Sequence, residues 1–249
     1  MDEGTAKVAA KDGKMLPKGT KTLIEFAYQR LRKDIINGRL APDSKLRIEH
    51  LRATYEIGAS TLREALTLLV ADALVISEGQ RGFRVAPISL DDLRDVTRMR
   101  KMMETLALRD AIERGDDRWE GGIVAAFHQL SRVEERLSAE TELVADSWED
   151  RNGQFHKALI AACSSRWILH FREILYYQSE RYRRFSLVSQ QVERRDIHAE
   201  HKAIMDATLA RNADLACRLT EEHMDNTLST MTRLLAKSLP ETAAAGKVG

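Results

Sequence analysis

Residues 46–85 constrain the fold more than any other part of the chain, because two helical patterns are followed directly by a hairpin pattern. Apolar side chains recur at helical spacing in both patterns: Ile48, Leu51 and Tyr55 in the first, and Leu62, Leu66 and Leu69 in the second. Gly58 lies between the two and supplies a tight turn. Phe83 and Val85 alternate after a glycine-tipped loop, which predicts a β-hairpin. Together these elements predict a winged helix-turn-helix.

The second of these helices has the size and the side chains of a helix that enters the major groove of DNA. The polar and basic positions are Ser60, Thr61 and Arg63 on its outer face, and Gln80, Arg81 and Gly82 at the hairpin tip. Two amphipathic helices joined by a turn are also common in protein cores. The helix pair alone therefore leaves both interpretations open, and the basic wing is what favours DNA binding.

A family resemblance is carried by residues 31–38, 62–66 and 82–85. These segments resemble the N-terminal domain of GntR-family transcription regulators, in which LREAL-like and GFRV-like motifs recur. The chain departs from the family at the start of the recognition helix, where Gly58-Ala59 stands in place of the usual Ser-Arg pair. The resemblance therefore implies DNA contacts from Arg47, Thr61 and Arg63, and from the wing.

The composition favours a mainly α protein, because Gly and Pro are sparse, at 13 and 4 residues, and only 6% of the residues are aromatic. No apolar run approaches the roughly 18–20 residues needed to cross a bilayer, and the N-terminus lacks the apolar segment of a secretory signal. Cys163 and Cys217 lie in helical patterns without a CxxC spacing, as expected of reduced thiols. We therefore expect a cytoplasmic protein with no membrane partner.

The length of 249 residues suits two modest domains, and Ser89 is a good N-cap for a new helix just after Pro87. Residues 17–87 have 12 Lys and Arg against 8 Asp and Glu, whereas residues 88–249 have 24 against 27. The basic excess thus falls in the winged helix, as contacts with DNA phosphates require. We expect a flexible tail over 1–16, a DNA-binding domain over 17–87, an all-helical effector-binding and dimerisation domain over 88–239, and a second tail over 240–249.

The second domain shows only helical patterns, interrupted near residues 115, 140, 164, 189–193 and 212, which predicts about six helices. An all-helical domain behind a winged helix resembles the FadR branch of the GntR family. The effector-binding domain of that branch, often called FCD, is a bundle of six or seven helices. The resemblance covers residues 20–238 and implies a mainly α homodimer that binds a palindromic DNA operator, since one recognition helix covers only a half-site.

Three of the seven histidines form a pattern with an asparagine. Asn152 and His156 are four residues apart and share one helix face. His201 lies eleven residues before Asn212 and His223 lies eleven after it, so antiparallel helices that turn at Asn212 place both at the same height. Three imidazoles and an amide oxygen would then suit zinc, nickel or a similar divalent metal. On spacing alone, ordinary core histidines remain the commoner outcome.

The family resemblance favours the metal interpretation. Many FCD domains bind a metal through an Asp-x3-His pair and two later histidines, and Asn152, His156, His201 and His223 occupy those positions. Asn152 stands in place of the usual aspartate. Because an amide is an uncharged and weaker donor, we expect a lower metal affinity, or a coordination shell that the bound effector completes.

Arg100 falls on the buried stripe of the first helix of this domain, four residues after Val96. A guanidinium that faces a core needs an anion. Either an intrahelical pair with Glu104 supplies it, or Arg100 binds the carboxylate of a small effector; the Arg-x3-Glu step is also an FCD feature. The basic run 181–184 favours a solvated helix face with one member, Arg181, directed inward as a further effector contact.

Segments that include Arg47, Arg100 and residues 163–165 further resemble glutarate-responsive repressors of this branch. We therefore expect a repressor that a small carboxylate, such as glutarate, releases from its operator. An activator, or a regulator whose metal is purely structural, remains open. A metal-dependent hydrolase is disfavoured, because the sequence has no HExxH and places no acid as a general base beside the histidines.

Overall fold

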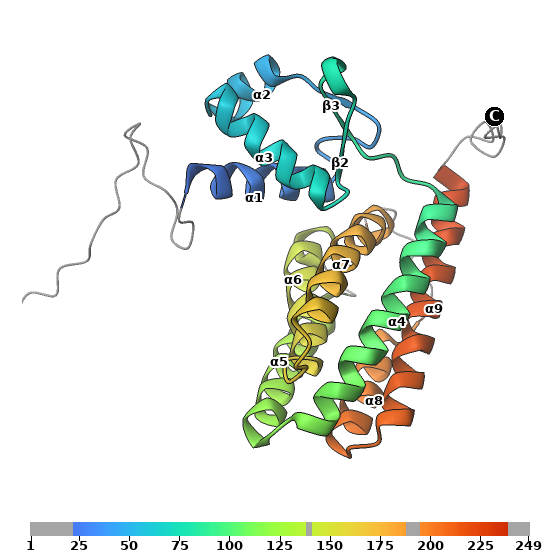
Figure 1. Cartoon of the computed structure of the whole chain (residues 1–249). Coiled ribbons are helices and arrows are strands. Elements are labelled where there is room, and N and C mark those ends of the chain that lie inside the picture. The colour runs from blue at the N-terminus through green and yellow to red at the C-terminus, as the bar shows by residue number, and fades with distance from the viewer. Residues whose placement is uncertain (1–21, 138–140, 188–194, 239–249) are drawn as a thin grey trace, which may run out of the picture. The chain divides into compact units, whose positions relative to one another are not determined.

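The computed structural model describes residues 22–137, 141–187 and 195–238. Internal contacts divide the chain between Pro87 and Ile88 into two compact units. Both units are built mainly of helices, and strands occur only in the first among the described residues (Figure 1). The predicted mainly α fold is confirmed.

The first unit combines three helices with a small sheet. Its elements are α1 (Leu23–Ile36), β1 (Lys45–Leu46), α2 (Ile48–Tyr55), α3 (Ala59–Ala71), β2 (Val75–Ser77) and β3 (Phe83–Val85). The strands are antiparallel in the order β1-β3-β2, with Val75 opposite Val85 and Leu46 opposite Phe83. The hairpin is as predicted, whereas β1 adds a third strand that the sequence pattern did not indicate.

The core of this unit forms where α3 packs against α1 and α2. Leu62, Leu66 and Leu69 of α3 are fully buried, as is Leu31 of α1. Each fully buried leucine contributes about 1.5–3 kcal/mol to folding. Burial of this stripe leaves the opposite face of α3 exposed to solvent, which is the face that a recognition helix needs.

The second unit is a bundle whose helices are α4 (Leu90–Arg114), α5 (Asp117–Leu137), α6 (Thr141–Leu159), α7 (Arg166–Leu187), α8 (Ile197–Leu209) and α9 (Ala213–Ser238). Ser89 caps α4 as predicted, since its hydroxyl accepts a hydrogen bond from the Asp92 amide at 3.1 Å. The most extensive helix contacts of this unit join α5 with α6, α4 with α9 and α7, and α8 with α9 (Figure 1). Within the described residues, none of the helices is long and apolar enough to span a bilayer.

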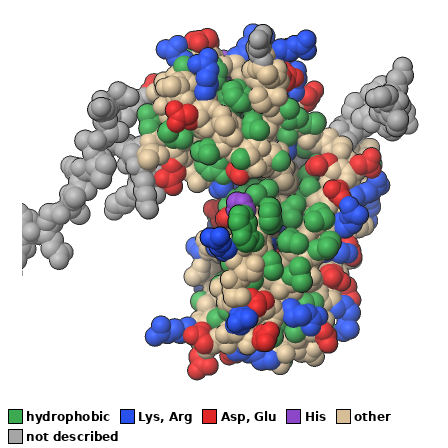
Figure 2. Space-filling view, viewed as in Figure 1, with side chains coloured by type: hydrophobic (Ala, Val, Ile, Leu, Met, Phe, Trp, Pro, Cys, Tyr) green, Lys and Arg blue, Asp and Glu red, His purple; other side chains and the backbone are tan. Residues whose placement is uncertain are grey.

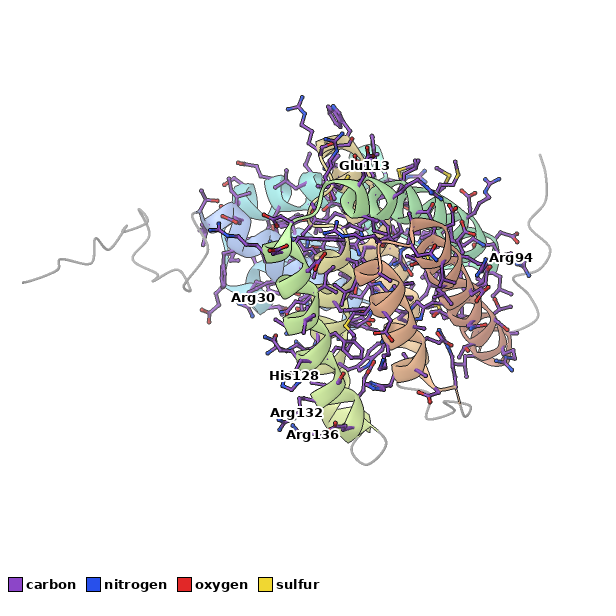
Figure 3. All side chains as sticks on the ribbon, turned by 90° about the horizontal axis from the view of Figure 1, so that it is seen from below. Arg30, Arg94, Glu113, His128, Arg132 and Arg136 are labelled. Atoms are coloured by element: carbon purple, nitrogen blue, oxygen red, sulfur yellow. The ribbon has the colours of Figure 1, made fainter. Side chains whose placement is uncertain are left out.

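The bundle core contains fully buried Ile123, Leu130 and Phe155, from α5 and α6. Charged side chains of both signs are interspersed with apolar ones over the face in Figure 2. Along α5, Arg132 and Arg136 point away from the bundle together with the exposed His128 (Figure 3). The outward position of His128 contrasts with the buried positions of His156, His201 and His223.

Candidate metal centre and ligand cavity

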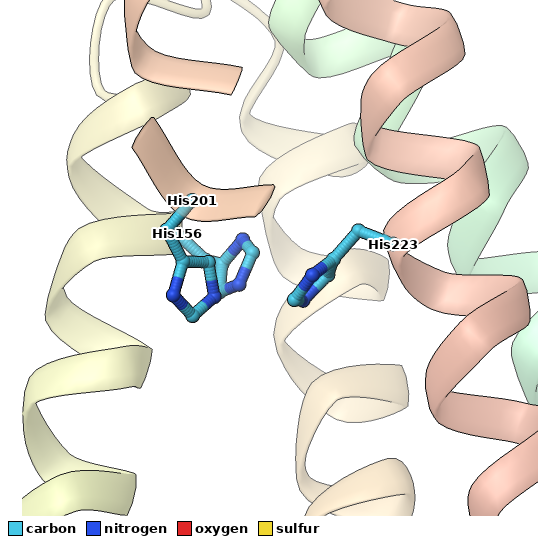
Figure 4. A group of neighbouring side chains, drawn as sticks. All are labelled: His156, His201 and His223. Atoms are coloured by element: carbon cyan, nitrogen blue, oxygen red, sulfur yellow. The ribbon is translucent and has the colours of Figure 1, made fainter. Parts of the chain in front are cut away.

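His156, His201 and His223 meet inside the bundle, although they come from three different helices, α6, α8 and α9 (Figure 4). One ring nitrogen from each lies within 4.8 Å of the others. The ring centroids of His201 and His223 are 4.7 Å apart, and each lies 5.3–5.4 Å from that of His156. All three side chains are buried.

The turn between α8 and α9 explains why two of these residues meet. Arg211 takes a left-handed backbone conformation, with φ of 57°, and Asn212 then caps α9 by accepting the Leu215 amide at 3.1 Å. The two helices pack side by side after this turn. Because His201 and His223 are equally far from Asn212 in sequence, they lie at the same height.

Two carboxylates orient the imidazoles of His201 and His223 by contacting their Nδ1 atoms. Nδ1 of His201 lies 2.8 Å from Glu134 on α5, and Nδ1 of His223 lies 2.8 Å from Glu200 on α8. An Nδ1–H that donates to a carboxylate leaves the Nε2 lone pair free, which is the usual arrangement around metal-binding histidines. Burial lowers the pKa of His223 to about 3 and also lowers that of His156, so both rings are neutral near pH 7.

Two buried atoms at the cluster have no hydrogen-bond partner among the described residues: Nε2 of His201 and Oδ1 of Asn152. A buried polar atom left unsatisfied costs about 1–3 kcal/mol. Both atoms carry a lone pair that a metal ion would accept. Three buried imidazoles and an amide oxygen therefore fit a borderline divalent metal ion by the chemistry of the donor set.

A cavity of about 80 Å³ opens beside this cluster. Its polar lining comprises Asn152, His156 and His223, the arginines Arg100, Arg183 and Arg195, and the hydroxyl residues Thr97, Ser179, Thr227 and Thr230. Its apolar lining comprises Trp148, Ile197, Met224, Leu228 and Met231. A cavity whose lining combines apolar side chains with convergent polar groups is the usual form of a small-molecule site.

Arg100 reaches the cavity from α4 and is nearly fully buried, at 6% exposure. Its guanidinium donates to Ser179 Oγ at 2.8 Å and to Glu104 Oε1 at 3.1 Å, while its Nε has no partner among the described residues. Burial lowers the pKa of Arg100 to about 10, which leaves it charged near pH 7. The intrahelical pair with Glu104 thus exists, and it coexists with a position at the cavity.

Two further arginines, Arg172 and Arg183, lie close to Arg100 and were not identified as site residues from the sequence. Arg172 donates to Glu104 Oε1 at 2.9 Å, and Arg183 donates to Glu149 at 3.1 Å and to Ser179 at 3.0 Å. The guanidinium carbons of Arg100, Arg172 and Arg183 lie 5.2, 4.7 and 4.6 Å from the centroid of the Tyr176 ring. A polar stripe on α7 at i, i+4, i+7 and i+11, from 172 to 183, was the available signal.

The solvated face predicted for the run 181–184 is wrong, because Arg181, Tyr182 and Arg183 are at most 6% exposed. Arg181 donates to Gln178 Oε1 at 3.3 Å and does not line the cavity. Each residue of a helix is turned by about 100° from the one before it, so Arg181 and Arg183, two residues apart, lie about 200° apart and do not share a face. Arg183 lies four residues after Ser179 on the same helix face, and both side chains line the cavity.

The side chains expected to meet DNA lie on exposed parts of the first unit. Arg47, Ser60, Arg63 and Arg81 are exposed and Thr61 is half-buried. Gly82 has a φ of 95°, which favours glycine, and Gln80 lies in the short 3-10 turn between β2 and β3. Another wing arginine, Arg84, is instead engaged by Glu78 at 2.8 Å.

Family models match both units of the chain. The model described as bacterial regulatory proteins, gntR family, matches residues 23–85, and the FCD domain model matches residues 95–226. The chain belongs to the GntR family. It is a transcription regulator with a DNA-binding winged helix and an FCD domain.

Relatives within the GntR family share most of the chain. The HTH-type transcriptional regulator BphR of Paraburkholderia xenovorans is 44% identical over 211 residues, which cover 85% of this chain and 86% of BphR. The HTH-type transcriptional repressor GlaR of Escherichia coli is 39% identical over 202 residues, covering 79% of this chain and 90% of GlaR. The structure of E. coli McbR/YncC has the same fold, with a TM-score of 0.73 at 16% identity over 87% of this chain and 100% of that one.

Proposed function

We propose that this GntR-family regulator is a homodimeric repressor that leaves a palindromic operator when a small carboxylate binds in the FCD cavity. Glutarate or a related dicarboxylate is the proposed effector. The similarity to the repressor GlaR supports the sign of the regulation. The observation that carries the proposal is a cavity in the helical unit, bounded by a histidine cluster and by arginines.

The balance of charge around the cavity favours an anionic ligand. Arg100 and Arg172 share one carboxylate, that of Glu104, and each retains a buried nitrogen without a partner among the described residues. Arg183 is paired with Glu149. A buried cation whose charge is only partly compensated is costly, so an incoming carboxylate would relieve an existing penalty.

The histidine cluster supplies the second attachment point. We propose that His156, His201, His223 and Asn152 hold Zn²⁺ or Ni²⁺. The ion would supply positive charge and an open position for a carboxylate oxygen. A dicarboxylate could then contact the metal through one end and Arg100 with Arg183 through the other, while the apolar lining contacts its methylene carbons.

The coupling to DNA follows from differential affinity. A ligand shifts a regulator only by binding one of its conformations more tightly than the other. Arg100 lies on α4, and α4 is the first helix after the DNA-binding unit in the chain. We propose that ligand contact with Arg100 changes the position of α4, and that this change disfavours the dimer geometry that matches the two operator half-sites.

The test measures fluorescence anisotropy of an operator duplex, selected from random sequences, across a panel of dicarboxylates at fixed salt. We expect release by one five-carbon diacid, loss of that response in Arg100→Ala, and an unchanged response in Arg98→Ala. Arg98 is a matched control because it lies on the same helix, 74% exposed, in an ion pair with Asp95. Unchanged operator affinity with every acid would refute the carboxylate effector.

Treatment with EDTA separates the two roles open to the metal. A response that EDTA abolishes supports a metal that contacts the effector. A response that survives EDTA would make the metal, if present, purely structural. Increased operator affinity on addition of the acid, or transcription that requires it, would indicate an activator instead of a repressor.

A further inference from the structure

Asn152 can present either of two different atoms to the histidine cluster, whereas an aspartate at this position would present an oxygen in both orientations. A carboxylate presents an oxygen at either end, whereas an amide presents an oxygen at one end and an NH₂ group at the other. Only the oxygen is able to coordinate a metal. A structure that uses Asn152 as a metal ligand therefore needs a partner that distinguishes the two ends of the amide.

Tyr176 on α7 is placed to make this distinction. Its hydroxyl carries one proton, which it donates to Glu149 Oε1 at 3.0 Å. Glu149 is held in turn by the Arg183 Nε, which lies 3.1 and 3.2 Å from the two carboxylate oxygens. The Tyr176 oxygen can then act only as an acceptor, and it accepts a hydrogen bond from Nδ2 of Asn152 at 3.4 Å.

Reversal of the amide would place the oxygen of Asn152 opposite the oxygen of Tyr176 with no proton between them. In the observed orientation, Oδ1 of Asn152 is instead buried without a partner among the described residues. The hydrogen bond from Asn152 Nδ2 to the Tyr176 oxygen is long and therefore weak. The preference for the observed orientation comes mainly from the unfavourable contact of two oxygens in the reversed one. A wrongly paired amide is disfavoured, because a buried polar atom would be left without a hydrogen bond.

The surroundings hold the Tyr176 hydroxyl in place. Gly153 follows Asn152, and a Cβ at Gly153 would lie 3.0 Å from the Tyr176 hydroxyl oxygen, closer than most side-chain contacts. The absence of a side chain there gives the hydroxyl its room. The guanidinium groups of Arg172 and Arg183 lie 4.7 and 4.6 Å from the ring centroid and restrict the ring from its faces.

We propose that Tyr176 is a positioning residue that holds the amide oxygen of Asn152 toward the metal ligands His156, His201 and His223. This inference rests on the metal site of the proposed function. It assigns to Tyr176 and Glu149 the task of making a neutral asparagine an effective metal donor. It also joins the metal site to Arg183 through a continuous chain of hydrogen bonds.

The test uses Co²⁺ alone as the probe, with affinity measured by chelator competition and coordination followed by visible absorption. We expect Tyr176→Phe to weaken Co²⁺ binding about 10- to 100-fold, the usual effect of losing an orienting partner. Tyr177→Phe is the matched control, because Tyr177 is the next residue and donates to Glu173 on the same helix. It should bind Co²⁺ like the wild type.

A double-mutant cycle distinguishes orientation from packing. Asn152→Asp presents an oxygen at either end, so Tyr176→Phe should change Co²⁺ affinity by less than about threefold in that background. Equal losses in both backgrounds would mean that Tyr176 acts through packing, and would overturn the inference. An unchanged affinity of Tyr176→Phe in the wild-type background would overturn it as well.

His201→Ala separates failure of this inference from failure of the metal site. If Co²⁺ binding is lost in His201→Ala but retained in Tyr176→Phe, the metal site stands and the role of Tyr176 is refuted. If the wild type does not bind Co²⁺, both are refuted. Loss of affinity in Tyr176→Phe that Asn152→Asp restores would support the assignment.

Discussion

Nδ1 of His201 lies 2.8 Å from Oε1 of Glu134, and the other oxygen of the same carboxylate lies 2.9 Å from Nδ1 of the exposed His198. One carboxylate on α5 thus orients a buried imidazole on α8. We expect Glu134→Gln to weaken Zn²⁺ binding about 10- to 100-fold, because the NH₂ end of the amide cannot accept a hydrogen bond from an imidazole. Isothermal titration measures this, with the adjacent exposed Glu135→Gln as the control, and equal affinities in both variants would contradict it.

Removal of the proposed metal ion should lower the stability of the protein. A ligand that binds only the folded state stabilises it by about 2.7 kcal/mol at 100 times its Kd. We expect EDTA to lower the Tm of the wild type in differential scanning fluorimetry. In His156→Ala the Tm should be the same with and without EDTA, and a shift of equal size in that variant would place the metal elsewhere.

Glu104 is the shared counter-charge of two buried arginines, at 3.1 Å from Arg100 and 2.9 Å from Arg172. Glu104→Gln leaves both guanidiniums without a carboxylate, and we expect a loss of about 3–5 kcal/mol in the free energy of unfolding. Urea denaturation measures this loss. The exposed pair of Arg98 with Asp95 gives the comparison, because Asp95→Asn should cost less than about 1 kcal/mol.

The wing and the recognition helix should differ in their effects on DNA binding. We expect Arg81→Ala to weaken binding to all sequences and to reduce the salt dependence by about one ion, as loss of one phosphate contact does. Arg63→Ala should cost about 1–3 kcal/mol on the operator and less on random DNA. Arg132→Ala, on α5 of the other unit, is the control. Anisotropy titrations at several salt concentrations check all three variants.

Asp110 links α4 to the start of α7, since it accepts the Ser164 amide at 2.6 Å and Arg114 at 2.7 Å. The hydrogen bond from Arg114 is the largest cause of a pKa held well below the ordinary value of an aspartate, followed by that from Ser164. A lowered folded pKa gives stability that is present above pH 4 and lost as the pH falls toward the folded value. We expect Asp110→Asn to cost about 1 kcal/mol at pH 7, allowing for partial exposure, and progressively less below pH 4 in urea denaturation.

The sequence was informative where helical periodicity and turn residues coincide. His201 and His223 were paired correctly in space because Asn212 marks a turn between antiparallel helices, and their equal distance from it fixes their height. Ser89 was found for a similar local reason, since its hydroxyl caps the helix that it precedes. In both cases a short-range rule determines the position.

Features that depend on long-range burial were not predicted from the sequence. The helix that contains Arg172 and Arg183 is rich in charged residues, as a solvated helix is. Only the packing of α7 against α4 shows that these two arginines face inward. Periodicity shows which residues share a face and does not show whether that face is buried. The strand β1 was missed because two residues carry no alternation, and its pairing depends on the partner β3.

The connection between β3 and α4 is short, since β3 ends at Val85 and α4 begins at Leu90. A segment of about four residues reaches at most roughly 14 Å when extended. In the proposed dimer it would act as a tether with little slack. Once one winged helix has bound its half-site, its twin would search a small volume, which corresponds to a local concentration in the millimolar range. Such a tether makes the spacing between half-sites a property that the protein itself dictates.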